Sequence, residues 1–158
     1  MRKYQKIGTK RFGIVGLVVD ITDPCYDKDI HCRMEVSVVE GEYECSVLIA
    51  DEGVYGKRVK AISIQLIGNN DKTTEEELGT IGVDSGLAGF FTDKPDYDDD
   101  AWSKFCATLN DDGKNHNAPA WIIPEGFFSE SGYGDGCYSV YAYKRANNDI
   151  VGLEIRFF

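Results

Sequence analysis

The chain has 158 residues, 42% of them hydrophobic and 12% aromatic, which fits one folded domain burying about 70% of its unfolded surface and excludes a disordered chain. It carries 17 basic and 27 acidic residues, a net charge of −10. A surface of this sign repels nucleic acid and anionic membranes, so we expect neither as a partner.

The N-terminal segment is basic. Residues 1–19 hold five cations and no acid: Arg2, Lys3, Lys6, Lys10 and Arg11. A basic arm for an acidic partner is one interpretation, and a solvated terminus is the simpler one. The apolar run 12–19 is broken by Gly13 and Gly16 and ends at Asp20, which predicts a buried first strand rather than a signal peptide. No stretch approaches the roughly 20 apolar residues of a membrane span, so we expect a cytoplasmic protein.

Alternating apolar residues then predict an antiparallel meander over residues 33–67. The period-two positions are Met34, Val36, Val38, Tyr43, Cys45, Val47, Ile49, Ile62, Ile64 and Leu66. The glycines of segment 53–56 mark a turn inside it. The polar run 68–78 follows, and we interpret it as an exposed linker.

One helix is predicted near residues 98–109. Asp98, Asp99 and Asp100 suit a helix N-terminus. The helix would be amphipathic, because its apolar residues recur at i, i+3, i+4 and i+7: Trp102, Phe105, Cys106 and Leu109. The run 110–113 is expected to end it. A hairpin of residues 137–143 and 150–158 around the turn 147–149 closes the chain.

The two halves of the chain resemble each other. Thr22–Asp29 aligns with Thr92–Asp100, with Lys94 as an extra residue in the second copy. We predict a mainly β single domain, residues 1–158, with a pseudo-repeat of about 12–67 and 79–158. Two similar antiparallel β units would pack as one sandwich or partly open barrel.

The acidic stretch after residue 92 raises the possibility of calcium, because hard cations take several oxygen ligands. The candidate ligands are Asp93, Asp96, Asp98 and Asp100. Ala101 and Ala107 stand where an EF-hand loop needs glycine and glutamate, so the stretch is not an EF-hand. Helix capping and a solvated loop account for the same residues, and we favour that interpretation.

Five cysteines at irregular spacing do not suggest a disulfide framework: Cys25, Cys32, Cys45, Cys106 and Cys137. A zinc site from Cys25, His31 and Cys32 lacks the usual paired spacing. A catalytic pair of Cys25 or Cys106 with His31 or His116 would need spatial proximity that spacing does not define. We therefore predict reduced thiols, no metal and no cofactor.

Three aspartates are candidates for acid–base catalysis. Asp20 and Asp84 sit beside apolar strand residues, where burial would raise a carboxyl pKa. Asp135 lies in the glycine-rich string 132–136. The alternative is that these residues cap turns, as Asp84-Ser85-Gly86 suggests, and we favour it.

The string 132–136 precedes a strand and contains no lysine, so it predicts a tight turn rather than a phosphate loop. Aromatic and acidic residues around it could form a surface for a ligand or a partner. The predicted surface residues are Tyr97, Trp121, Tyr133, Asp135, Tyr141 and Tyr143.

Three short strings carry a resemblance to a family. Gly134-Asp135-Gly136-Cys137-Tyr138-Ser139-Val140-Tyr141 resembles the G-D-G-x-Y-P-V-Y close of uncharacterised bacterial and phage-associated proteins, with Ser139 in place of proline. Val83-Asp84-Ser85-Gly86-Leu87 and Asp23-Pro24-Cys25-Tyr26 look like further signatures of that group. The resemblance implies a compact, mostly β bacterial domain of unknown function and carries over no catalytic residue.

Three functional hypotheses follow. The first is a non-enzymatic binding or protein-interaction module, whose acidic character suits a basic protein partner in an immunity-like or regulatory role, or a small ligand. The second is a small hydrolase that uses clustered carboxylates. The third is a calcium-dependent binding module. We favour the first, and the sequence does not define the oligomeric state.

Overall fold

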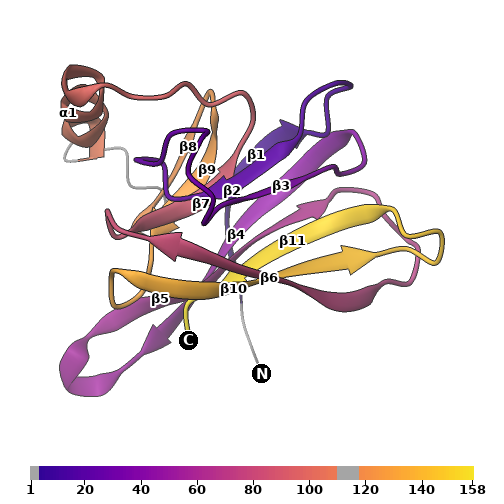
Figure 1. Ribbon diagram of the computed structural model, residues 1–158. Coiled ribbons are helices and arrows are strands. Elements are labelled where there is room, and N and C mark those ends of the chain that lie inside the picture. The colour runs from indigo at the N-terminus through magenta and orange to yellow at the C-terminus, as the bar shows by residue number, and fades with distance from the viewer. Residues whose placement is uncertain (1–3, 110–117) are drawn as a thin grey trace.

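The computed structural model describes residues 4–109 and 118–158 and is mainly β (Figure 1). Within these residues there are two antiparallel sheets, one α-helix and no closed barrel, which confirms the predicted sandwich. The six-stranded sheet has the order β1 (Tyr4–Phe12), β4 (Gly41–Asp51), β5 (Lys57–Leu66), β11 (Ile150–Arg156), β10 (Gly136–Lys144), β6 (Thr74–Val83). The five-stranded sheet has the order β3 (Met34–Val36), β2 (Val19–Thr22), β7 (Leu87–Phe91), β9 (Gly126–Glu130), β8 (Ala120–Ile123).

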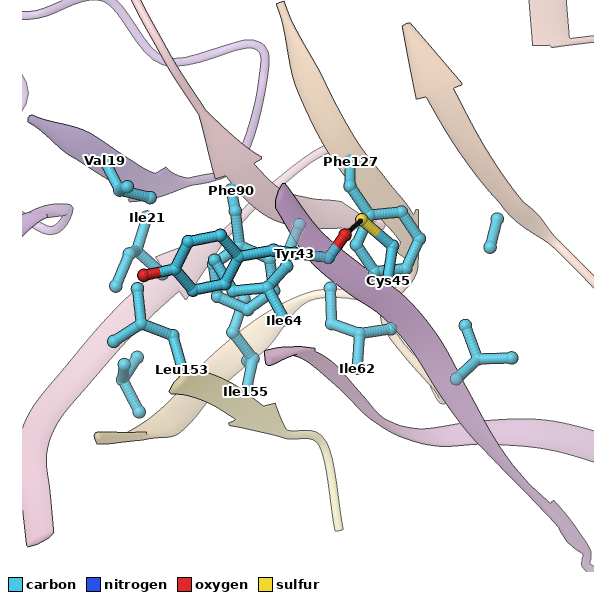
Figure 2. Packing of buried hydrophobic residues seen from close by; sticks show 14 of the residues in the cluster. Val19, Ile21, Tyr43, Cys45, Ile62, Ile64, Phe90, Phe127, Leu153 and Ile155 are labelled. Atoms are coloured by element: carbon cyan, nitrogen blue, oxygen red, sulfur yellow. Dashed lines mark hydrogen bonds between the residues drawn. The ribbon is translucent and has the colours of Figure 1, made fainter. Parts of the chain in front are cut away.

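The main core lies between the two sheets. Figure 2 shows the Tyr43 ring of the six-stranded sheet among Ile21, Phe90 and Leu153, which come from both sheets. Tyr43 is fully buried, and its hydroxyl donates a hydrogen bond to the Val39 carbonyl at 2.6 Å. A tyrosine therefore fits in this core without leaving an unpaired polar atom.

Period-two alternation located β3, β4, β5, β10 and β11, but it predicted neither the other described strands nor the sheet to which each strand belongs. β4 and β5 pair around the short 3₁₀ helix η1 (Gly53–Tyr55), and β10 pairs with β11 around a turn where Asn148 has φ 71°. β3, however, pairs with β2 in the other sheet, so the predicted meander over 33–67 is divided between the two sheets. The prediction that residues 68–78 form an exposed linker is wrong in part. β6 begins at Thr74, inside this segment, and pairs with β10.

The predicted buried strand over residues 12–19 is wrong for most of its length. β1 ends at Phe12, and residues 13–18 form a loop in which Gly13 and Gly16 have φ of 77° and 84°. Both angles belong to the left-handed region that glycine tolerates. The turn leaves the apolar side chains of this loop exposed, and Val15 is 89% accessible.

α1 (Asp99–Leu109) begins at the predicted place and packs on the outer face of the five-stranded sheet, away from the six-stranded sheet (Figure 1). Asp98 caps it, since its carboxylate accepts a hydrogen bond from the Ala101 amide at 2.8 Å. Phe105 packs against Phe128 with ring centroids 5.3 Å apart. No helix among the described residues is long and apolar enough to cross a membrane. The predicted helix stop at 110–113 lies outside the described residues.

The strand order has a regularity that bears on the predicted repeat. The six-stranded sheet has the same order from each edge to its centre. One edge gives β1, β4 and β5, which are the first strand and the last two strands of the first half. The other edge gives β6, β10 and β11, which are the first strand and the last two strands of the second half. β5 and β11 pair antiparallel at the centre of this sheet, and β2 pairs antiparallel with β7 where the two halves meet in the five-stranded sheet. A two-fold relation between the halves would give this order, and that relation stays a prediction.

Truncation to alanine should affect stability very differently at a buried and at an exposed hydrophobic side chain. Phe90→Ala should lower the free energy of unfolding by about 3–5 kcal/mol, because Phe90 is fully buried between the sheets and its removal leaves a cavity. Val54→Ala, at a side chain that is 95% exposed, should change it by less than about 0.5 kcal/mol. Urea denaturation of both variants measures the difference, and equal losses would contradict the assigned core.

Candidate functional site

A cleft of 510 Å³ opens where α1 meets two turns. Trp102, Cys106 and Leu109 of α1 form one side, and the β6–β7 turn at 85–87 and the β9–β10 turn at 130–134 form the other. The Ser131 amide donates a hydrogen bond to the Gly86 carbonyl at 3.0 Å, which joins the two turns. Two strings that the sequence analysis singled out, Val83–Leu87 and Gly132–Gly136, thus contribute to one cleft.

The third string does not line the cleft, but its Asp23 contacts one of the segments that does. This side chain is fully buried, and its carboxylate accepts hydrogen bonds from the Asp84 amide at 2.7 Å and the Ser85 amide at 2.6 Å. It also accepts from the Ser85 hydroxyl at 2.6 Å and the Cys25 amide at 2.8 Å. Asp23 therefore shapes the turn that lines the cleft, a role that sequence reasoning gave to Asp84 itself.

Tyr26 adds a second link between the same segments. Its hydroxyl donates a hydrogen bond to the Asp84 carboxylate at 2.9 Å. Burial and this carboxylate raise the pKa of Tyr26, so the phenol stays protonated and remains a donor. The Asp23-Pro24-Cys25-Tyr26 and Val83-Asp84-Ser85-Gly86 strings are thus held together by side-chain hydrogen bonds, 58 to 62 residues apart in sequence. Spacing alone contains no signal for this contact.

Tyr133 stands at the mouth of the cleft. Its side chain is 52% exposed, yet its hydroxyl donates to Glu52 at 2.8 Å and the Arg58 guanidinium lies 5.0 Å from its ring centroid. The rings of Tyr55 and Phe158 lie 6.3 Å and 5.3 Å from it. These contacts fix an exposed ring in one orientation.

The other residues of the predicted surface lie elsewhere. Trp121 is 5% exposed and stacks on Phe128 in the cluster beneath α1, so it forms no accessible surface. Tyr97 packs against the same cluster. Tyr141 and Tyr143 lie on the outer face of the six-stranded sheet, where Arg156 covers the Tyr141 ring at 3.6 Å. Of the six predicted residues, only Tyr133 and the exposed Asp135 lie on the β9–β10 turn.

The three candidate catalytic aspartates belong to separate surroundings. The Asp20 carboxylate pairs with the Arg33 guanidinium at 3.0 Å and lines a second cavity, which neither Asp84 nor Asp135 lines. Burial raises the pKa of Asp20, and the Arg33 cation partly offsets this effect. Asp84 accepts the Tyr26 hydrogen bond. This arrangement does not bring the three carboxylates into one cleft.

The aspartates considered for calcium have other partners. Asp96 accepts a hydrogen bond from the Lys28 amide at 2.9 Å, Asp98 caps α1, and Asp100 pairs with Lys104 at 3.0 Å. The Asp93 carboxylate lies 3.9 Å from the Lys28 ammonium. Across residues 4–109 and 118–158, no three His, Cys, Asp or Glu side chains gather as a metal site would require, including Cys25, His31 and Cys32.

The thiols of the candidate Cys-His pairs are protonated at neutral pH. Burial and the Asp23 carboxylate raise the pKa of Cys25 to about 12. Burial also raises the pKa of Cys106, which lines the cleft. A thiol is nucleophilic as its thiolate, so neither residue is activated. His31 is exposed, and His116 lies outside the described residues.

Comparison with protein families, with curated proteins and with solved structures finds no match for this chain. The resemblance to bacterial and phage-associated proteins therefore stays a prediction.

The Asp23 network makes a stability prediction. Asp23→Asn should lower the free energy of unfolding by about 2–3 kcal/mol, because one amide oxygen replaces two carboxylate oxygens and leaves buried donors without an acceptor. Asp93→Asn is the matched control, since Asp93 occupies the aligned position but is exposed. Thermal and urea denaturation measure both, and a neutral Asp23→Asn would refute the role assigned to this carboxylate.

Proposed function

We propose that this protein is a non-enzymatic binding module that captures an apolar segment of a partner protein in the cleft between α1 and the β9–β10 turn. One observation carries the proposal: two of the strings singled out by sequence contribute residues to this cleft, and the third is hydrogen-bonded to one of them. Segments 85–87 and 132–134 line it, and Asp23 holds the Ser85 backbone and hydroxyl. Concave sites with apolar walls and a few polar groups are the usual form of a binding site.

The chemistry of the wall supports an apolar ligand with hydrogen-bonding capacity. Trp102, Leu87 and Leu109 supply apolar surface, while Arg58 and Glu130 supply one charge of each sign. A peptide segment offers both an apolar side chain and backbone donors and acceptors, which match this wall.

Tyr133 supports a macromolecular partner because it is ordered before binding. An exposed ring that is already fixed by Glu52 and Arg58 loses little conformational entropy when a partner covers it. Tyrosine is among the residues that most often dominate binding energy at protein interfaces.

The surface beyond the cleft favours a protein over a small ligand. Tyr55 is 66% exposed and Phe158 is 39% exposed, and together with Tyr133 they extend the aromatic surface past the cleft mouth. Arg58 and Lys60 lie against two of these rings, at 5.0 Å and 5.4 Å from their centroids. A strongly basic partner, as the net charge suggested, would meet these two cations, so we propose an apolar contact segment instead.

Tyr133→Ala should weaken capture of the partner by about 30-fold or more, the effect of losing a residue worth about 2 kcal/mol of binding energy. Tyr141→Ala is the matched control, because it removes the same type of side chain from the outer face of the six-stranded sheet, where it does not line the cleft. Quantitative affinity capture from the native host, with wild type and both variants at equal concentration, measures the effect.

The expected result is a protein that is retained by wild type and Tyr141→Ala and lost with Tyr133→Ala. Both variants should keep the wild-type melting temperature within a few degrees, since neither side chain belongs to the main core. Retention of the same proteins by Tyr133→Ala would contradict the proposal.

A further inference from the structure

Arg58, which lines the cleft, differs from the other arginines of this acidic protein. The other arginines in the described part of the chain each form an ion pair with at least one carboxylate: Arg11, Arg33, Arg145 and Arg156. Arg58 forms none with any Asp or Glu of residues 4–109 and 118–158. In a protein with 27 acidic residues, the charge of this arginine is thus left available to a ligand.

Neutral groups hold the Arg58 guanidinium in place. Its Nε donates a hydrogen bond to the Tyr55 carbonyl at 3.1 Å, and its Nη1 lies 3.5 Å from the Gly132 carbonyl oxygen. The centroid of the Tyr133 ring lies 5.0 Å from its Cζ. Of the five N–H groups of a guanidinium, these contacts engage one on Nε and one on Nη1. Nη2 has no hydrogen-bond partner among the described residues, so a positioned fork remains open to an acceptor.

The acidic residues near Arg58 do not neutralise it. The Glu52 carboxylate accepts the Tyr133 hydroxyl at 2.8 Å, and the Asp51 carboxylate accepts the Gly53 amide at 3.0 Å. Glu130 lines the same cleft without forming an ion pair with Arg58. A ligand with several acidic groups would be repelled by Glu52 and Glu130, whereas a single carboxylate can pair with Arg58.

The position of Arg58 relates it to the apolar part of the cleft. Trp102, Leu87 and Leu109 line the same cleft, and Arg58 lies against Tyr133 at its mouth. A segment that places an apolar side chain between α1 and the β9–β10 turn therefore brings the adjacent residue to the mouth. The exposed rings of Tyr55 and Phe158 continue past the mouth, so the bound chain can extend in that direction. This favours an acidic side chain within a segment over the carboxylate at the end of a chain.

We infer that Arg58 selects a partner segment in which one Asp or Glu stands next to the apolar residue that enters the cleft. The inference rests on the proposed function, since it names the chemistry of the segment that the same cleft would bind. The partner carboxylate would accept charge-assisted hydrogen bonds from Nη1 and Nη2 of Arg58. The guanidinium would keep its contact with the Tyr133 ring, because an arginine can stack on an aromatic face and bind a carboxylate at its edge.

The net charge of −10 does not oppose one carboxylate at this place. At physiological ionic strength, exposed charges separated by more than about 8 Å are largely screened. Lys60 provides a second cation on the same surface, since its ammonium lies 5.4 Å from the centroid of the Phe158 ring. That ring lies 5.3 Å from the Tyr133 ring. The local charge around the aromatic surface therefore includes two cations that an acidic side chain can approach.

Peptide selection tests the inference on the folded protein. A phage-displayed library of random peptides, fused to the coat protein through their C-terminal ends, is selected on the wild-type protein. The selected peptides are then tested on Tyr133→Ala, which identifies those that need the cleft mouth. We expect peptides that require Tyr133 to carry a single Asp or Glu directly beside an aromatic or aliphatic residue.

A double-mutant cycle then assigns the acid to Arg58. In the tightest peptide, replacing the carboxylate by its amide should weaken binding to the wild-type protein about 10-fold, the effect of losing a charged hydrogen-bonded pair. The same replacement should change binding to Arg58→Gln by less than about twofold, because no cation remains to pair with the carboxylate. Arg11→Gln is the matched control, since Arg11 is exposed on β1 and does not line the cleft. It should keep the 10-fold difference.

The outcomes separate this inference from the proposed function. Peptides that need Tyr133 but show no enriched acid, or that enrich basic residues, would overturn the inference and leave the proposed function in place. An amide replacement that weakens binding equally to wild type and Arg58→Gln would do the same. If no selected peptide needs Tyr133, the proposed function fails, and the inference fails with it. The amide replacement alters only the peptide, so the wild-type measurement does not depend on the folding of a variant.

Discussion

The buried carboxylate of Asp23 is the interaction on which the candidate site depends. It lies just after β2 in the first half of the chain and accepts hydrogen bonds from the turn between β6 and β7 in the second half. A carboxylate with four donors is stable in a buried position because each bond to the charged group replaces a bond to water. The turn it holds at 84–85 leads into the wall of the cleft.

The five-stranded sheet packs against the six-stranded sheet on one face and against α1 on the other. The helix therefore forms a further layer outside the two sheets. Phe90 and Phe127 face the main core, while Phe91 and Phe128 on the same two strands face α1. Adjacent phenylalanines can serve both faces because successive side chains of a strand point in opposite directions. The helix covers the outer pair, and the cleft opens at the edge of that covered area.

Charge is distributed in a way that net charge does not describe. The chain is acidic overall, yet Arg58 and Lys60 lie against the exposed aromatic rings near Tyr133. At the second cavity, which Asp20 lines, both acidic and lysine side chains contribute to the wall. These local arrangements, rather than the total of −10, set the charges that lie around each cavity.

The sequence by itself determined the mainly β class, the helix after Asp98 and the positions of β3, β4, β5, β10 and β11, because alternation, caps and turns are local properties of the chain. It did not determine that β3 pairs with β2, that residues 13–18 form an exposed loop or that Trp121 is buried. Only the tertiary structure decided that Asp23 reaches Ser85 and that Arg58 lies against the Tyr133 ring. Such contacts join segments through space, and neither spacing nor composition records which distant partner a side chain meets.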